Sequence, residues 1–143
     1  MSSKFRRLAE GFWVASQIGP AELKDVAALG VAVVINNRPD HEEPGQPTGA
    51  EIEDAARKAG LAYVEIPVES MNIAEAQLDA LQAMIASAKG PLLAYCRTGT
   101  RSTVLRAMAL ARAGAPIDAL ISEAAQAGYD LEGLRSRLEA MSS

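Results

Sequence analysis

Short apolar runs alternate along the chain with longer segments in which apolar residues recur every three or four positions. The runs predict a sheet of about four strands, at residues 12–16, 31–35, 61–68 and 91–96. The longer segments predict helices at residues 20–29, 48–59, 72–88, 101–113, 116–127 and from about 131 onward. Because strands and helices alternate, we expect a three-layer α/β fold in which helices flank a small, mostly parallel sheet.

Two of the predicted helices begin with the residue pattern of a capping box. In this motif, the side chains of the N-cap residue and of the residue three positions later bind backbone N–H groups that the helix leaves free. Thr48 and Glu51 form one such pair, and Asn72 and Glu75 form the other. The pattern therefore predicts that these two helices begin at residues 48 and 72.

Three loops leave the carboxyl ends of the predicted strands. They span residues 36–47, 69–72 and 96–101. In a parallel sheet these ends lie along one edge, and ligands bind in the crevice just beyond them. We therefore expect the three loops to converge on one site.

The third loop contains the only cysteine, Cys96, where an apolar strand turns sharply into a helix. Backbone N–H groups at such a junction, backed by the helix dipole, bind an anion and favour the nucleophilic thiolate form of a cysteine. Arg101 could bind two oxygens of an oxyanion, and the Ser102 hydroxyl could hydrogen-bond the thiolate. The residues expected to bind substrate through this loop are Arg97, Thr98, Gly99 and Thr100. The alternative is that Cys96 is a small buried hydrophobic residue at a strand end.

Composition narrows the class of protein. A length of 143 residues predicts one domain, spanning residues 1–143. The net charge of −4, with no basic run, argues against a nucleic-acid partner, and no apolar run approaches the roughly 20 residues of a membrane span. One cysteine and one histidine exclude a disulfide within the chain and a Cys- or His-rich metal site, and no cofactor motif is present. We expect a cytoplasmic protein without a metal or cofactor.

Five stretches occur in an order that resembles a known family. They are residues 12–18, 34–40, 63–68, 96–102 and 127–131. Together they resemble the bacterial phosphatase-like domain of the beta-lactamase hydrolase-like family, which occurs alone or joined to a metallo-β-lactamase-like hydrolase. The resemblance implies the fold of dual-specificity protein phosphatases and makes such a hydrolase a candidate partner in the same pathway. The family has been linked to phosphatase activity and also to sulfur transfer in sulfide metabolism.

The Cys96 loop differs in length from the phosphatase pattern. Four residues separate Cys96 from Arg101, whereas five separate the two residues in phosphatases of this type and four in the rhodanese sulfurtransferases. A smaller ring of N–H donors fits the terminal sulfur of a persulfide better than a full phosphate. The residue before the cysteine is Tyr95, where many of these phosphatases have a histidine.

The general acid also differs. Phosphatases of this type carry an aspartate in the loop after the preceding strand, and it protonates the leaving group. This chain has no aspartate at residues 69–72, so Glu69 is the candidate substitute, with a solvated loop carboxylate as the alternative. Sulfur transfer from thiosulfate needs no such acid, because sulfite is a good leaving group.

Three hypotheses follow. The favoured one is a sulfurtransferase, in which Cys96 takes a sulfane sulfur from thiosulfate or a related donor and passes the persulfide to an acceptor thiol. The alternative is a phosphatase that hydrolyses phosphomonoesters or phosphotyrosine through a cysteinyl-phosphate on Cys96. The third is an inactive module that senses an oxyanion or binds a partner.

The loop at residues 36–47 supplies two more candidates. Arg38 could contact substrate, and Asp40 could act as an acid or orient Arg101. Alternatively, Arg38 and Asp40 pair with each other and pin the loop. His41 follows Asp40 and is expected to be exposed, without a catalytic role.

Overall fold

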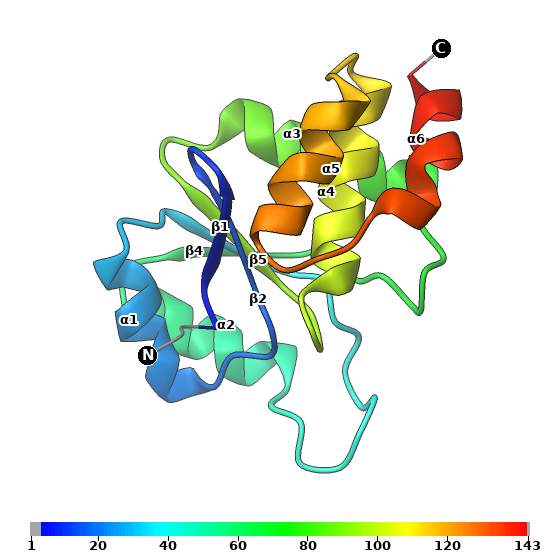
Figure 1. Cartoon of the computed structure of the whole chain (residues 1–143). Helices are drawn as coiled ribbons and strands as arrows, with labels where there is room; N and C mark the ends of the chain where they lie inside the picture. The colour runs from blue at the N-terminus through cyan, green and yellow to red at the C-terminus, as the bar shows by residue number, and fades with distance from the viewer. Residues whose placement is uncertain (1–3, 143) are drawn as a thin grey trace.

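A five-stranded sheet forms the middle layer of the computed structural model, which describes residues 4–142 (Figure 1). The expected domain limits, residues 1 and 143, lie outside the described residues. In spatial order the strands are β1 (Arg6–Ala9), β2 (Phe12–Ala15), β5 (Leu92–Tyr95), β3 (Val33–Asn36) and β4 (Ala62–Glu65). The last four of these run parallel, which confirms the predicted α/β fold with a small, mostly parallel sheet.

Strand β1 is the one strand that the apolar pattern did not predict. It pairs antiparallel with β2, and Gly11, whose φ is 81°, lies in the turn between the two strands. Arg6 and Arg7 are exposed and only Leu8 is buried, because β1 lies at the edge of the sheet. An edge strand of this kind carries no continuous apolar run, so the pattern could not predict it.

Helices cover both faces of the sheet, as predicted (Figure 1). One face packs against α1 (Leu23–Ala28) and α2 (Gly49–Lys58), and the other against α3 (Glu75–Ser87), α4 (Thr100–Arg112), α5 (Ile117–Gln126) and α6 (Arg135–Met141). Single turns of 3₁₀ helix at Pro20–Glu22 and Glu132–Leu134 precede α1 and α6. The sheet is therefore the central layer of three.

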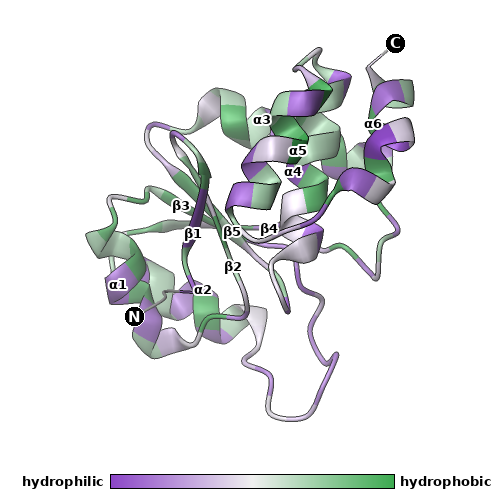
Figure 2. Ribbon diagram, in the orientation of Figure 1, coloured by the Kyte–Doolittle hydropathy of each residue, from purple (hydrophilic) through white to green (hydrophobic). Residues whose placement is uncertain are grey.

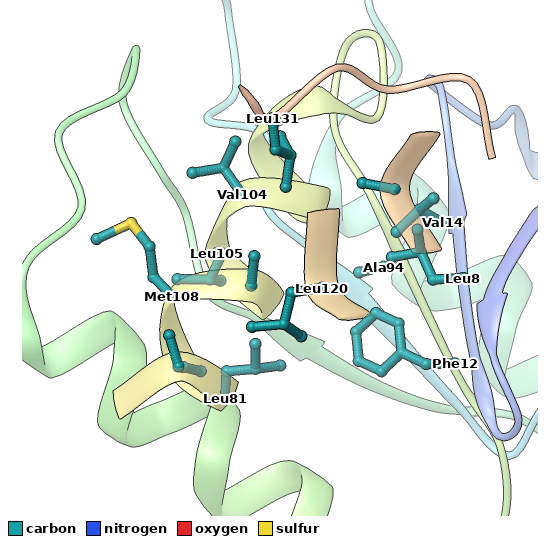
Figure 3. Close-up of a cluster of buried hydrophobic side chains, with 14 of the residues drawn as sticks. Leu8, Phe12, Val14, Leu81, Ala94, Val104, Leu105, Met108, Leu120 and Leu131 are labelled. Carbon is teal, nitrogen blue, oxygen red and sulfur yellow. The ribbon is translucent and has the colours of Figure 1, made fainter. Parts of the chain in front are cut away.

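Alternation along the strands divides the core into two clusters. In β3, Val33 and Ile35 belong to the cluster under α3–α6, whereas Val34 between them belongs to the cluster under α1 and α2. Figure 3 shows part of the larger cluster, in which Phe12 of the sheet and Leu120 of α5 point toward one another. Figure 2 shows mostly apolar central strands and helices along which apolar and polar residues alternate.

Two predicted boundaries differ from the structure. The strand predicted at residues 61–68 ends at Glu65, although Ile66 N and Val68 N still donate to the Asn36 and Asn37 carbonyls, each over 2.9 Å. The capping box at Thr48 and Glu51 is confirmed, with Glu51 N donating to Thr48 Oγ1 over 3.1 Å. The box predicted at Asn72 and Glu75 is wrong. Asn72 N instead donates to the Glu69 carbonyl in a tight turn, and α3 begins at Glu75, with its N-cap at Ala74.

Candidate active site

Cys96 lies directly after β5, where the chain turns into α4, and its side chain is buried. The backbone N–H of Gly99 donates to Cys96 Sγ over 3.1 Å. Gly99 has a φ of 93°, a backbone conformation that favours glycine. A Cβ at this position would also lie 2.1 Å from the Tyr129 hydroxyl oxygen. The loop therefore turns tightly enough for a backbone N–H to reach the sulfur, and only glycine fits at the turn.

Tyr129 packs on the outside of this loop, in the segment that follows α5. Its hydroxyl donates to the Thr98 carbonyl oxygen over 3.0 Å. Burial raises the pKa of the Tyr129 phenol, so the hydroxyl keeps its proton and stays a donor at neutral pH. Within the loop, the Thr98 hydroxyl donates to the Thr100 hydroxyl over 3.0 Å. A hydroxyl from a distant part of the chain therefore helps to hold the loop in shape.

Arg101, in the first turn of α4, returns toward Cys96. Its Nη1 donates to Glu42 Oε2 and to the Val68 carbonyl, both over 2.7 Å, and its Nη2 donates to Glu42 Oε1 over 2.8 Å. The hydrogen bond to Glu42 raises the pKa of Arg101, burial opposes this rise, and the interactions with Cys96, a hydrogen bond among them, add to it. The guanidinium thus lies within the electrostatic reach of the sulfur while two other loops hold it.

Glu42 joins Arg101 to a second arginine. Arg38 is 2% exposed, and its Nε donates to Glu42 Oε1 over 2.8 Å. Its two other nitrogens donate to Gln17 Oε1 and Glu43 Oε1. The hydrogen bond from Arg101, and then that from Arg38, lower the pKa of Glu42 to about 2 against the opposing effect of burial. Glu42 is therefore ionised at neutral pH and accepts from both arginines.

These contacts decide between two expectations for Arg38. Its three side-chain nitrogens each donate to an oxygen of this chain, so Arg38 holds the loop, but not through the pair with Asp40 that the alternative expected. Its partners, however, are Glu42, Glu43 and Gln17, and not Asp40. The expected contact of Arg38 with substrate is not supported by its 2% exposure.

Asp40 and Ser102 do not lie where the sequence suggested. Asp40 Oδ1 accepts from Gly49 N over 2.8 Å and so binds the start of α2 instead of Arg101. The Ser102 hydroxyl donates its one proton to Asn37 Oδ1 over 2.7 Å, and no described contact joins it to Cys96. Asp40 stands only two residues before Glu42 but turns toward α2, and Ser102 faces the buried end of β3. Both side chains stabilise the loops around the site.

An open pocket of about 530 Å³ lies above the Cys96 loop. Its lining residues are Glu42, Ser70, Met71, Arg97, Thr98, Thr100 and Arg101. Glu69 is exposed and is absent from this lining, so the carboxyl group considered as a general acid lies outside the pocket. Arg97 lies at the rim, with 64% of its side chain exposed and Glu43 at 3.8 Å. His41 is exposed, as expected.

Four residues near the site were not singled out from the sequence: Asn37, Glu42, Met71 and Tyr129. Asn37 is fully buried and binds both Ser102 and the Ile66 carbonyl. Glu42 stands only four residues after Arg38, a spacing that brings two opposite charges together in a turn. Tyr129 lies 31 residues from the carbonyl that it binds, and no local pattern could indicate that contact.

Residues 4–142 contain no group of three or more His, Cys, Asp or Glu side chains arranged to bind a metal ion. The same described residues contain no helix that is both long and apolar enough to cross a membrane. The polar side chains of the pocket are instead arginines, threonines, one serine and one ionised carboxylate. This set offers hydrogen-bond donors and positive charge, which suit an oxyanion.

Comparison with known sequences matches residues 4–115 to the family described as "Beta-lactamase hydrolase-like protein, phosphatase-like domain". A beta-lactamase hydrolase-like protein of Agrobacterium fabrum is 41% identical over 99 residues, which are 69% of this chain and 23% of that protein. The chain therefore spans about a quarter of the length of this relative.

Comparison with solved structures finds a Neisseria meningitidis protein described as a candidate phosphatase. It is 35% identical, with a TM-score of 0.88, and the match covers 98% of this chain and 99% of that one. Human DUSP28 shares the fold at 20% identity, with a TM-score of 0.65 over 99% of this chain and 95% of that chain. The fold is thus that of the dual-specificity and tyrosine phosphatases.

Proposed function

This chain belongs to the family of phosphatase-like domains of beta-lactamase hydrolase-like proteins, and we propose that it is a cysteine-dependent phosphatase. The observation that carries the proposal is the arrangement of Cys96 and Arg101 on a phosphatase fold, with Gly99 N at 3.1 Å from the sulfur. The favoured hypothesis from sequence was sulfur transfer. The comparisons support the phosphatase hypothesis better, because the matched family and the similar structures are phosphatase-like.

In the proposed reaction, the Cys96 thiolate attacks the phosphorus of a phosphate monoester. A P–S bond forms, the bond from phosphorus to the leaving oxygen breaks, and that oxygen keeps the electron pair and takes a proton from water. A second water then attacks the cysteinyl-phosphate, and the P–S bond breaks to regenerate the thiolate and release inorganic phosphate. Backbone N–H groups of the loop and the Arg101 guanidinium would stabilise the charge on the phosphoryl oxygens in both steps.

The contacts of the pocket favour aryl phosphates among the monoesters. Glu42, the one carboxylate that lines the pocket, is ionised and holds two arginines, so it has no proton to give. Glu69 lies outside the lining. A phenolate, whose conjugate acid has a pKa of about 10, leaves without a general acid more readily than the alkoxide of serine or threonine. We therefore propose substrates of the phosphotyrosine type.

Met71 supports the same substrate class. It lines the pocket, and it is a large hydrophobic residue that is 42% exposed. A flexible thioether beside the pocket mouth is a favourable contact for an aromatic ring. In the proposed complex, the ring of the substrate lies against Met71 while its phosphate lies in the Cys96 loop.

Sulfur transfer is the second candidate, and one observation favours it. The loop from Cys96 to Arg101 has four intervening residues, the number expected for a rhodanese-type loop. In that reaction Cys96 would take a sulfur atom from thiosulfate, release sulfite, and pass the persulfide sulfur to an acceptor thiol. With no second cysteine in the chain, the acceptor would be another molecule.

One pair of assays separates the two candidates. The full chain is given p-nitrophenyl phosphate in one assay and thiosulfate with cyanide in the other, each beside Cys96→Ser. We expect p-nitrophenol from the unaltered protein, none from the variant, and no thiocyanate from either. Thiocyanate without p-nitrophenol, together with one added sulfur on Cys96 by mass spectrometry, would overturn the phosphatase proposal.

The proposed chemistry and the names of the relatives also suggest where the protein acts and with which partner. A nucleophilic thiolate must stay reduced, which favours the cytoplasm. The longer relatives are named as beta-lactamase hydrolase-like proteins, so a metallo-β-lactamase-like hydrolase in the same pathway is a proposed partner.

A further inference from the structure

Arg101 has five N–H bonds, and three of them are already used. Nη1 donates to Glu42 and to the Val68 carbonyl, and Nη2 donates once to Glu42. The Nε–H and the second N–H of Nη2 remain. These two lie parallel on one edge of the planar guanidinium, and such an edge binds two oxygens of one oxyanion. Among residues 4–142, the partner left for this edge is Cys96, whose hydrogen bond with Arg101 contributes to the raised pKa of the guanidinium, so the edge faces the sulfur.

Glu42 therefore occupies the tip of the guanidinium and leaves the edge of Nε and Nη2 to face Cys96. An oxyanion bound at the sulfur could accept from this edge without displacing the carboxylate. Val68, from the segment after β4, holds the outer N–H of Nη1 at the same time, so contacts from two loops fix the plane of the group. Only 11% of the Arg101 side chain is exposed, which leaves it little room to turn.

Glu42 is itself held by a buried anchor. Arg38 donates to Glu42 Oε1 from a position that is 2% exposed, and Gln17 fixes the far side of Arg38. Glu42 N also donates to Gln46 Oε1 over 3.0 Å. Glu42 is thus held both at its side chain and at its backbone N–H. Because the buried Arg38 fixes the Glu42 carboxylate, the carboxylate in turn fixes the orientation of Arg101 in the pocket.

We propose that Glu42 is a positioning residue, which presents the Nε and Nη2 edge of Arg101 to the oxyanion of the substrate. This inference rests on the proposed function for its effect on turnover. It does not make Glu42 a general acid or a ligand of the substrate. Its effect is on the transition state, because the charge on the phosphoryl oxygens is stabilised only if both donors point at them.

The test compares Glu42→Gln with Glu43→Gln. The two changes remove the same charge from neighbouring residues, but Glu43 contacts Arg38 and not Arg101. With p-nitrophenyl phosphate, we expect kcat of Glu42→Gln to fall on the order of 10- to 100-fold. KM should not rise, since a negative charge near the anion has been removed. Glu43→Gln should change kcat far less. Equal effects of the two variants, or a gain in kcat for Glu42→Gln, would overturn the proposal.

A second measurement does not depend on turnover. In ¹⁵N NMR of the full chain, a guanidinium fixed on its Nη atoms gives separate Nη signals, because rotation about its C–N bonds is slow. We expect separate signals for Arg101 in the unaltered protein and in Glu43→Gln, and a merged signal in Glu42→Gln. Merged signals in the unaltered protein would refute the positioning role. If the protein lacks phosphatase turnover but keeps this NMR pattern, the proposed function fails while the positioning of Arg101 stands.

Discussion

The two loops that flank the pocket differ in how they are held. The loop between β3 and α2 is fixed by the ion pairs of Arg38 and Glu42, by Asp40 on Gly49 N, and by Gln46. The segment between β4 and α3 gives the site one backbone carbonyl, from Val68, and then presents the exposed Glu69 and Met71. Ser70 between them has a φ of 51°, which is uncommon for a residue with a side chain.

This difference suggests that the protein holds the oxyanion of the substrate firmly and the rest of the substrate loosely. The fixed loop and the Cys96 loop surround the place where an oxyanion would lie. The second segment faces the rest of the substrate and offers a side chain that can adjust its shape. We therefore expect changes on the oxyanion side to affect kcat and changes on the other side to affect KM.

Replacing Arg101 should have the largest effect on kcat, because it removes a group that we expect to bind the oxyanion directly. In Arg101→Lys the positive charge remains, but the fork of parallel donors and the contacts to Glu42 are lost. We expect kcat for p-nitrophenyl phosphate to fall on the order of 100- to 1000-fold, as when one donor of an oxyanion site is removed. Steady-state kinetics measure the effect, and a fall of less than a few-fold would mean that Arg101 does not bind the reacting group.

Replacing Gly99 should have the second-largest effect, because it disturbs the backbone of the Cys96 loop that surrounds the oxyanion. Gly99→Ala imposes a φ of 93° on a residue with a side chain and forces the Tyr129 hydroxyl away from the loop. The conformation alone costs about 1 to 2 kcal/mol of unfolding free energy.

Gly114→Ala is the matched control for that variant. Gly114 has a φ of 98° but no heavy atom near the position of a Cβ, so it reports the backbone cost alone. Urea titration of both variants measures the difference, and kcat should fall only in Gly99→Ala. If both variants lose the same stability and keep kcat, the Tyr129 contact does not shape the loop.

Replacing Met71 tests the other loop, the segment between β4 and α3, which we expect to affect KM and not kcat. Met71→Ala removes the thioether beside the pocket, and loss of about 1 kcal/mol of apolar contact would raise KM for an aryl phosphate several-fold with kcat unchanged. Leu29→Ala is the control, since Leu29 is also a large exposed hydrophobic residue and does not line the pocket. A fall in kcat with KM constant would contradict the division of roles between the two loops.

The smallest expected effect is a pH dependence of stability. The folded pKa of Glu42, about 2, lies below its ordinary value of 4.5, so its ion pairs stabilise the fold fully above about pH 5. That stabilisation is lost as the pH falls from 4.5 toward 2. The difference in Tm between the unaltered protein and Glu42→Gln should therefore shrink over this range. Glu53→Gln removes a carboxylate from an exposed pair on α2 and should not show this narrowing.

The sequence was sufficient to predict the four parallel strands of the sheet, their order along the chain and the place of Cys96, but not the edge strand β1. Continuous apolar runs and helical spacing depend on local patterns, and β2 and α4 lie within a few residues of their predictions. The position of Arg101 near Cys96 also follows from a local spacing, as the geometry of the loop supports.

The contacts between distant segments could not be predicted in the same way. Asp40 and Glu42 are two residues apart, and no periodicity tells which of the two carboxylates turns toward Arg101. The structure assigns that place to Glu42, because Asp40 binds the N-terminus of α2. Ser102 was expected to face the sulfur, but the buried amide of Asn37 accepts its proton instead. Such choices depend on which buried polar groups need a partner, and this is known only once the chain is folded.

The antiparallel strand β1 has a consequence for association between molecules. A sheet edge with free N–H and C=O groups can template a strand from another chain, which leads to aggregation. Here one edge is the short β1, with exposed Arg6 and Arg7, and Arg6 is held by the Ala127 carbonyl. The other edge is the four-residue β4, which Pro67 follows. Charge at one edge and proline near the other protect the sheet against edge-to-edge pairing.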